Sequence, residues 1–172
     1  MFAKITVFLI LTLTSYFSFS QDIFEAARNG DLKKIKEITE VNAEAVKAVN
    51  DQGFTPLMIA CYRGQTKAAK LLVEKGAEVN SASPEGSALQ AAVYQNNTKL
   101  ACFLLEKGAN MNAKGPDGNT ALMYAVLNQN EKLVKALVNK GADLKLVNND
   151  NQTAHSLAMT QENKTIQVLT QF

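Results

Sequence analysis

Apolar and polar positions recur along this chain with a period of about 33 residues, and helical spacing runs within each period. Each unit opens on a hydroxyl residue, has an alanine five residues later and a glycine 21 residues after the opening. These landmarks are Thr55, Ser87, Thr120 and Thr153; Ala60, Ala92, Ala125 and Ala158; and Gly76, Gly108 and Gly141. Self-similarity at a fixed period predicts a stacked array of repeats.

One unit, residues 53–80, shows how the pattern predicts two helices. Thr55 can accept from a free backbone N–H at a helix start, and Pro56 follows where its missing N–H costs nothing. Residues 68–73 supply the apolar face of a second helix, which ends where Gly76 can enter the left-handed region. Such a short helix pair cannot bury its apolar faces alone, so each pair needs neighbours.

The Thr-Pro-Leu opening at Thr55, the alanine-centred helix, the Leu-rich second helix and the Gly-Ala-x-x-Asn exit at Gly76 resemble the ankyrin repeat. The resemblance implies an all-α ankyrin-repeat solenoid of about five stacked helix-turn-helix repeats with short β-hairpin loops. It places repeats at 21–50, 51–83, 84–115, 116–148 and 149–172.

The first repeat departs from this template. We expect a capping repeat with a first helix at 23–29, capped by Asp22, and a second helix at about 31–41. Asn42 occupies the position of the later glycines, where asparagine tolerates the left-handed conformation best after glycine. The link from Gly30 to Thr55 is one residue longer than later links, so this loop should be irregular.

Two further departures concern the contacts between repeats. The link from Gly76 to Ser87 is one residue shorter than the next link and carries Pro84, which predicts a tight or malformed hairpin. Ankyrin repeats typically carry a histidine whose hydrogen bonds tie neighbouring loops. Its equivalents here are Met58, Gln90, Met123 and Ser156. We therefore expect a weak polar network between loops, with helix packing supplying more of the stability.

Residues 1–20 differ from the rest in composition. Lys4 is their only charge, an apolar run follows at 5–13, and small and polar residues precede Gln21. This order is typical of a secretory signal peptide. We expect cleavage after Ser20 and an exported, periplasmic or secreted protein without a stable membrane anchor, although an uncleaved anchor stays open. Sequons at Asn96, Asn151 and Asn163 would invite glycosylation in a eukaryotic secretory pathway, so a bacterial periplasm is favoured.

The charge and residue inventory argues against nucleic-acid binding and against enzymatic chemistry. The chain has 18 Lys and Arg residues against 16 Asp and Glu, and the lysines are scattered rather than clustered. His155, the single histidine, aligns with apolar positions and should be a partly buried structural imidazole. Cys61 and Cys102 align with different helix layers, which disfavours a disulfide. We expect no catalytic residues, no metal and no cofactor; a small thiol-dependent or hydrolytic enzyme using Cys102 or His155 remains the alternative.

The resemblance implies that a protein partner docks on a concave face formed by loop tips and first-helix ends. The residues carried over to that face are Phe54, Tyr62, Arg63, Glu85, Tyr94, Gln95, Asn119, Leu127 and Asn128, with Arg28, Asn29, Thr160 and Gln161 in the outer repeats. Tyrosine and arginine are favoured interface anchors. The interpretation is a monomeric, non-enzymatic protein–protein interaction module; a secreted effector acting in a host cell is the other alternative.

Overall fold

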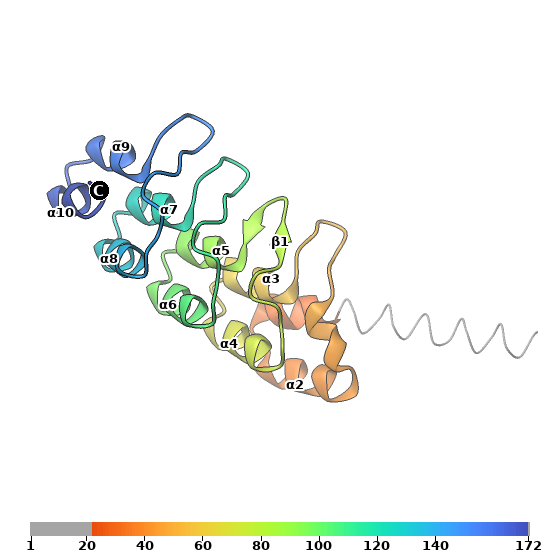
Figure 1. Ribbon diagram of the computed structural model, residues 1–172. Coiled ribbons are helices and arrows are strands. Elements are labelled where there is room, and N and C mark those ends of the chain that lie inside the picture. Colours follow the sequence, from red (N-terminus) through yellow and green to blue (C-terminus); the bar gives the residue numbers. More distant parts are fainter. Residues whose placement is uncertain (1–21, 172) are drawn as a thin grey trace, which may run out of the picture.

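The computed structural model describes residues 22–171, so the predicted signal peptide lies outside the described residues. Pairs of antiparallel helices stack along one axis in two rows, as Figure 1 shows. One row holds the first helix of each repeat and the other holds the second, while the loops project from the first row. The predicted all-α repeat solenoid is confirmed.

The first row contains a helix at residues 22–29, α3 (Pro56–Tyr62), α5 (Ala88–Tyr94), α7 (Ala121–Leu127) and α9 (Ala154–Met159). The second row contains α2 (Leu32–Val41), α4 (Thr66–Glu74), α6 (Thr98–Glu106), α8 (Glu131–Asn139) and α10 (Lys164–Leu169). A short 3-10 helix, η1 (Ala43–Lys47), follows α2. None of the helices between residues 22 and 171 combines the length and apolarity that crossing a bilayer requires.

The hydroxyl landmarks cap the first-row helices as predicted. Each side-chain oxygen accepts from the backbone N–H three residues later, which satisfies one of the free donors at a helix start. The N···O distances at Thr55, Ser87, Thr120 and Thr153 are 3.2, 3.3, 3.4 and 3.1 Å. These caps fix the residue at which each first-row helix begins, so the second helix of each of these repeats follows at the same spacing along the chain.

The glycine landmarks end the second-row helices, also as predicted. Gly76, Gly108 and Gly141 have φ of 95°, 82° and 87°, a region that side-chain-bearing residues rarely adopt. The expectation for Asn42 is wrong: its φ is −141°, and its side chain accepts from the Glu44 N–H to begin η1. The longer first link is thus occupied by a 3-10 helix. Asp22 is likewise already helical rather than a cap, and it pairs with Lys34 at 3.7 Å.

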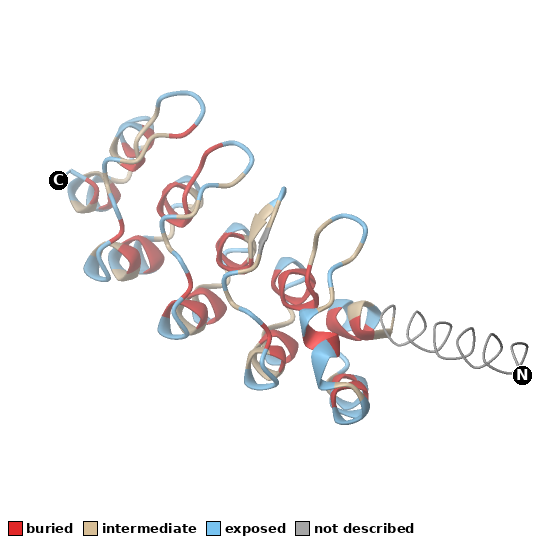
Figure 2. Cartoon of the chain, turned by 45° about the vertical axis from the view of Figure 1, so that its right-hand side comes forward, coloured by how far each residue is buried: buried red, intermediate tan, exposed pale blue. Residues whose placement is uncertain are grey.

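The core lies between the two rows, where Figure 2 shows the buried residues facing one another. The four landmark alanines, Ala60, Ala92, Ala125 and Ala158, are all 0% exposed. Their small side chains let neighbouring first-row helices approach closely. Leucines on α4, α6 and α8 fill the space between the rows, and the core continues through every repeat. Burial that depends on the neighbouring repeat on each side is what stabilises a solenoid.

The sequence predicts a tight or malformed hairpin between the second and third repeats, and the structure shows a tight one. Strands β1 (Ala82–Ser83) and β2 (Gly86–Ser87) pair antiparallel, which leaves Pro84 and Glu85 as a two-residue turn. The other projecting loops within 22–171 carry no strand pair. Each closes instead through two backbone hydrogen bonds, such as those from the Asn50 N–H to the Phe54 carbonyl at 3.0 Å and from the Gly53 N–H to the Asn50 carbonyl at 2.9 Å. Only one loop therefore fits the expected β-hairpin description.

The expectation of a weak polar network between loops is wrong at Gln90. This side chain is 5% exposed, and its Nε2 donates to the carbonyls of Ala113 and Asn119 at 3.1 and 2.9 Å. Its Oε1 accepts from the Ser87 N–H at 2.8 Å. The amide thus ties the third repeat to the following loop. Glutamine supplies both a donor and an acceptor, so it can do what the family's histidine does.

A second polar ladder joins the turns between the helices of successive repeats. The Asn97 amide donates to the Thr66 hydroxyl at 2.7 Å, and the Asn130 amide donates to the Thr98 hydroxyl at 2.7 Å. In the last step the Asn163 amide donates to Glu131 at 2.8 Å. The polar contacts therefore fix the position of each repeat on the next at both ends of the helices.

Candidate functional site

A groove of about 700 Å³ lies between the first-row helices and the projecting loops of the second and third repeats. Its lining includes six of the residues proposed from the sequence: Arg28, Phe54, Tyr62, Arg63, Glu85 and Tyr94. These side chains come from the helix at 22–29, from α3 and the residue after it, from α5, and from the loops before α3 and α5. Only the stacking of repeats brings these segments together. We call this feature the groove below.

Three tyrosines from successive repeats line the groove and form a row. The rings of Tyr62 and Tyr94 are parallel within 8°, with centroids 6.2 Å apart. The ring of Tyr124 meets Tyr94 edge-on, at 89° and 6.3 Å. Tyr62 and Tyr94 are 51% and 59% exposed although both are large and mostly apolar. We call Tyr62, Tyr94 and Tyr124 the tyrosine row.

Sequence reasoning missed Tyr124. It considered the last residue of each first helix and the residue after it, and so took Leu127 and Asn128 from the fourth repeat. Residues three apart share one face of a helix. The position three before Leu127, which is also the position of Ile59 and Ala91 in their repeats, could therefore have been included; all three residues line the groove.

An ionised carboxylate fixes the orientation of Tyr124. Its hydroxyl donates to Asp117 at 2.8 Å. Burial first, and then this hydrogen bond and the charge of Asp117, raise the pKa of Tyr124 above its usual value. Burial alone would raise the pKa of Asp117, but hydrogen bonds from the Asn119 N–H, the Tyr124 hydroxyl and the Asn119 amide outweigh it and leave that pKa lowered. Tyr124 thus stays neutral and held in place at the end of the row.

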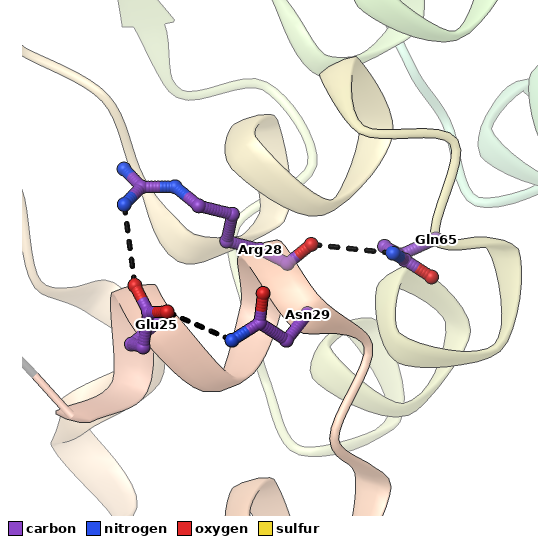
Figure 3. A network of polar contacts seen from close by, with 4 residues as sticks. All are labelled: Glu25, Arg28, Asn29 and Gln65. Atoms are coloured by element: carbon purple, nitrogen blue, oxygen red, sulfur yellow. Dashed lines mark hydrogen bonds and ion pairs between the residues drawn. The ribbon is translucent and has the colours of Figure 1, made fainter.

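The two arginines of the groove differ in their electrostatic environment. Arg28 pairs with Glu25 at 3.2 Å, and the Asn29 amide donates to the same carboxylate at 2.8 Å (Figure 3). Gln65 then donates to the Arg28 carbonyl at 3.2 Å, which joins the first two repeats. Arg63 is exposed and takes part in no ion pair within residues 22–171. Its charge is therefore available to a partner.

The other predicted contact residues lie outside the groove. Asn119 was expected at an exposed loop tip, but it is 7% exposed, donates to Asp117 at 2.6 Å and accepts from the Asn148 amide at 3.0 Å. Its role is structural. Asn128 is partly buried and donates to the Val93 carbonyl at 2.7 Å.

Gln95 and Leu127 are exposed, the latter by 45%, but neither lines the groove. In the last repeat Thr160 is also exposed, while Gln161 is partly buried. The predicted residues that line the groove thus come from the first three repeats, and those of the fourth and fifth repeats lie outside it.

The side chains considered for catalysis, those of the two cysteines and the histidine, are buried or partly buried. Both cysteines are free: Cys61 is fully buried, which raises the pKa of its thiol, and Cys102 is partly buried on α6. His155 is partly buried, as predicted, with Nδ1 3.4 Å from the Thr170 hydroxyl. Within residues 22–171 no three His, Cys, Asp or Glu side chains are grouped to hold a metal ion.

Stacked helix pairs with loops projecting over a groove define a helical repeat protein of the interaction type. The family model of ankyrin repeats (3 copies) matches residues 23–115 and 89–171. The chain belongs to the ankyrin-repeat family. Members of this family generally serve as non-enzymatic protein–protein interaction modules.

Curated relatives share only part of the chain. Rat "Ankyrin repeat and SAM domain-containing protein 6" is 44% identical over 59 residues, which is 34% of this chain and 7% of that protein. Mouse "Protein fem-1 homolog A-like" is 43% identical over 42 residues, 24% of this chain and 6% of that protein. Human "Oxysterol-binding protein-related protein 1" is 33% identical over 69 residues, 35% of this chain and 7% of that protein. The matches thus span less than a tenth of these relatives.

Proposed function

We propose that this protein is an exported, non-enzymatic binding module that holds a protein partner in the groove. The exposed pair of Tyr62 and Tyr94 within the tyrosine row is the observation that carries the proposal. Two tyrosines that are more than half exposed lie side by side next to a cation without an ion-pair partner in the described chain. Tyrosine and arginine together are the residues most often found as interface anchors. Membership of a family of interaction modules supports the same assignment.

Export is the second part of the proposal and rests on the sequence of residues 1–20. A single basic residue, an apolar run and a small-residue site before Gln21 fit the requirements of a cleaved signal peptide. A bacterial periplasm is the compartment we favour, and a monomer is the form we expect. An effector released into a host cell would share the groove and differ only in where its partner is found.

The experiment is capture of the partner from the envelope fraction of the source cell, followed by titration against variants. Tyr62→Ala and Tyr94→Ala should each weaken binding by about 2 kcal/mol, roughly thirtyfold, as central aromatic anchors do. Their thermal stability should barely change, because both side chains are more than half exposed.

Lys135→Ala on α8 is the matched control, since this exposed lysine lies in the second row of helices. It should leave the affinity unchanged. Loss of affinity in the Lys135 variant with retention in both tyrosine variants would place the partner on the other side of the molecule. Labelling by a thiol probe together with activity in a hydrolase panel would favour the enzyme alternative at Cys102 or His155 instead.

A further inference from the structure

We infer that the groove binds an extended, proline-bearing segment whose acidic side chain pairs with Arg63. This inference rests on the proposed function, because it names the chemistry of the partner segment held in the same groove. Three independent features of the lining carry it: the spacing of the tyrosine row, the free phenolic hydroxyls and the position of the charges.

The size of the groove and the spacing of its rings fit an extended chain. A volume of about 700 Å³ is the size of sites that enclose a small ligand, so it accommodates a few residues of a chain rather than a folded surface. The rings of the row follow one another at 6.2 and 6.3 Å. Two residues of a polyproline-II segment span about 6.2 Å, at about 3.1 Å per residue. Such a segment can therefore advance by two residues from one ring of the row to the next.

The hydroxyls of the row favour a segment whose carbonyls are free. The Tyr124 hydroxyl already donates to Asp117, whereas those of Tyr62 and Tyr94 have no acceptor within residues 22–171. A polyproline-II segment has no internal hydrogen bonds and leaves all its carbonyls available. Proline rings also pack well on aromatic faces, and aromatic-lined grooves are the usual sites for such segments. Tyr62 and Tyr94 therefore provide exposed aromatic surface and two hydroxyl donors for a proline-bearing segment.

The charges select an acidic side chain. Arg28 is already neutralised by Glu25, so Arg63 is the lining cation that lacks a partner in the described chain. Glu85 is the acidic residue of the lining, and it lies on a different element, at the turn between β1 and β2. Arginine donates bidentately to a carboxylate, which makes the pairing directional. A basic segment would lose this pairing and would meet the repulsion of Arg63.

The test uses three synthetic peptides titrated against the protein by isothermal calorimetry. The first is five prolines with an aspartate at each end, so that either chain direction can present a carboxylate to Arg63. The second replaces both aspartates by lysine, and the third replaces the prolines by glycine and serine. The first should bind at least about tenfold more tightly than either of the others, a difference of about 1.4 kcal/mol. Equal affinities, or tighter binding of the lysine peptide, would overturn the inference.

Variants assign the effect to named groups. Arg63→Gln should abolish the preference for aspartate over lysine ends, and Tyr94→Ala should weaken binding of the acidic proline peptide about tenfold. Tyr94→Phe keeps the ring and loses the hydroxyl, so it should give a smaller, severalfold loss. Lys135→Gln is the matched control and should change nothing, and unchanged far-UV circular dichroism shows that each variant folds.

The outcomes separate this inference from the proposed function. If the captured protein partner loses affinity in Tyr94→Ala while the acidic proline peptide does not bind, the groove is a binding site and the inference about its occupant is wrong. If neither the partner nor the peptide responds to the Tyr94 variants, both the proposed function and the inference fail.

Discussion

Truncation of Leu104 tests whether the fold behaves as a one-dimensional stack. This side chain is 0% exposed on α6, which packs between α4 and α8 and against α5. Buried Leu→Ala changes cost about 2 to 5 kcal/mol, depending on how far the surroundings collapse into the cavity. Helices on both sides restrict that collapse, so Leu104→Ala should fall in the upper half of this range.

The matched change is Leu169→Ala in the last helix. Leu169 is partly buried, and α10 packs mainly on α8 and α9. A side chain that keeps part of its surface in water loses less on truncation, so we expect a cost below about 2 kcal/mol.

Urea unfolding followed by far-UV circular dichroism measures both variants. A loss of about 4 kcal/mol at Leu104 corresponds to a fall in Tm of about 8 to 16 °C for a domain of this size. Equal losses at Leu104 and Leu169 would refute the reasoning, because a stack predicts that the middle of the array depends on more neighbours than its end.

The remaining predictions address export, the loop network and pH. N-terminal sequencing of native protein should give Gln21, and recovery of the intact chain from the cytoplasm would reject export. Gln90→Met, which installs the residue that the second and fourth repeats use at this position, should cost about 1–3 kcal/mol in urea unfolding, because it removes the hydrogen bonds to the following loop; unchanged stability would mean that these bonds contribute nothing. The lowered pKa of Asp117 means that its carboxylate stabilises the fold above its unfolded pKa of about 3.9 and loses this contribution as the pH falls. Asp117→Asn should therefore cost at most about 1 kcal/mol at pH 7, since the site is exposed, and less at about pH 3; an equal or larger cost in acid would contradict this sign.

The parts of the fold that depend on local chemistry could be predicted from the sequence. Hydroxyl caps and helix-ending glycines each act within one repeat, and the structure confirms both. The sequence also predicts that Phe54, Tyr62, Arg63 and Tyr94 lie close together, because equivalent positions of successive repeats are neighbours once the helices stack.

The errors concern contacts between loops of different repeats. Asn119 seemed exposed because it sits at a loop tip, yet Asn148, 29 residues later, covers it. Gln90 occupies the position of the family's histidine, whose hydrogen bonds were expected to be lost. Its side chain instead donates to carbonyls 23 and 29 residues further along the chain. Asn42 followed a positional rule that the longer first link overrides. For Asn119 and Gln90 the deciding partner lies in the next projecting loop, whereas the conformation of Asn42 is set by η1 within the first repeat.

The most direct test of the binding face is hydrogen–deuterium exchange of the protein with and without its captured partner. Binding in the groove predicts slower exchange in the partner's presence at the C-terminal end of α3, in the hairpin at 82–87 and in α5. It predicts unchanged exchange in α4 and α6, which belong to the second row. Protection confined to α4 and α6, with α3, α5 and the hairpin unchanged, would contradict the assignment of the groove as the binding site.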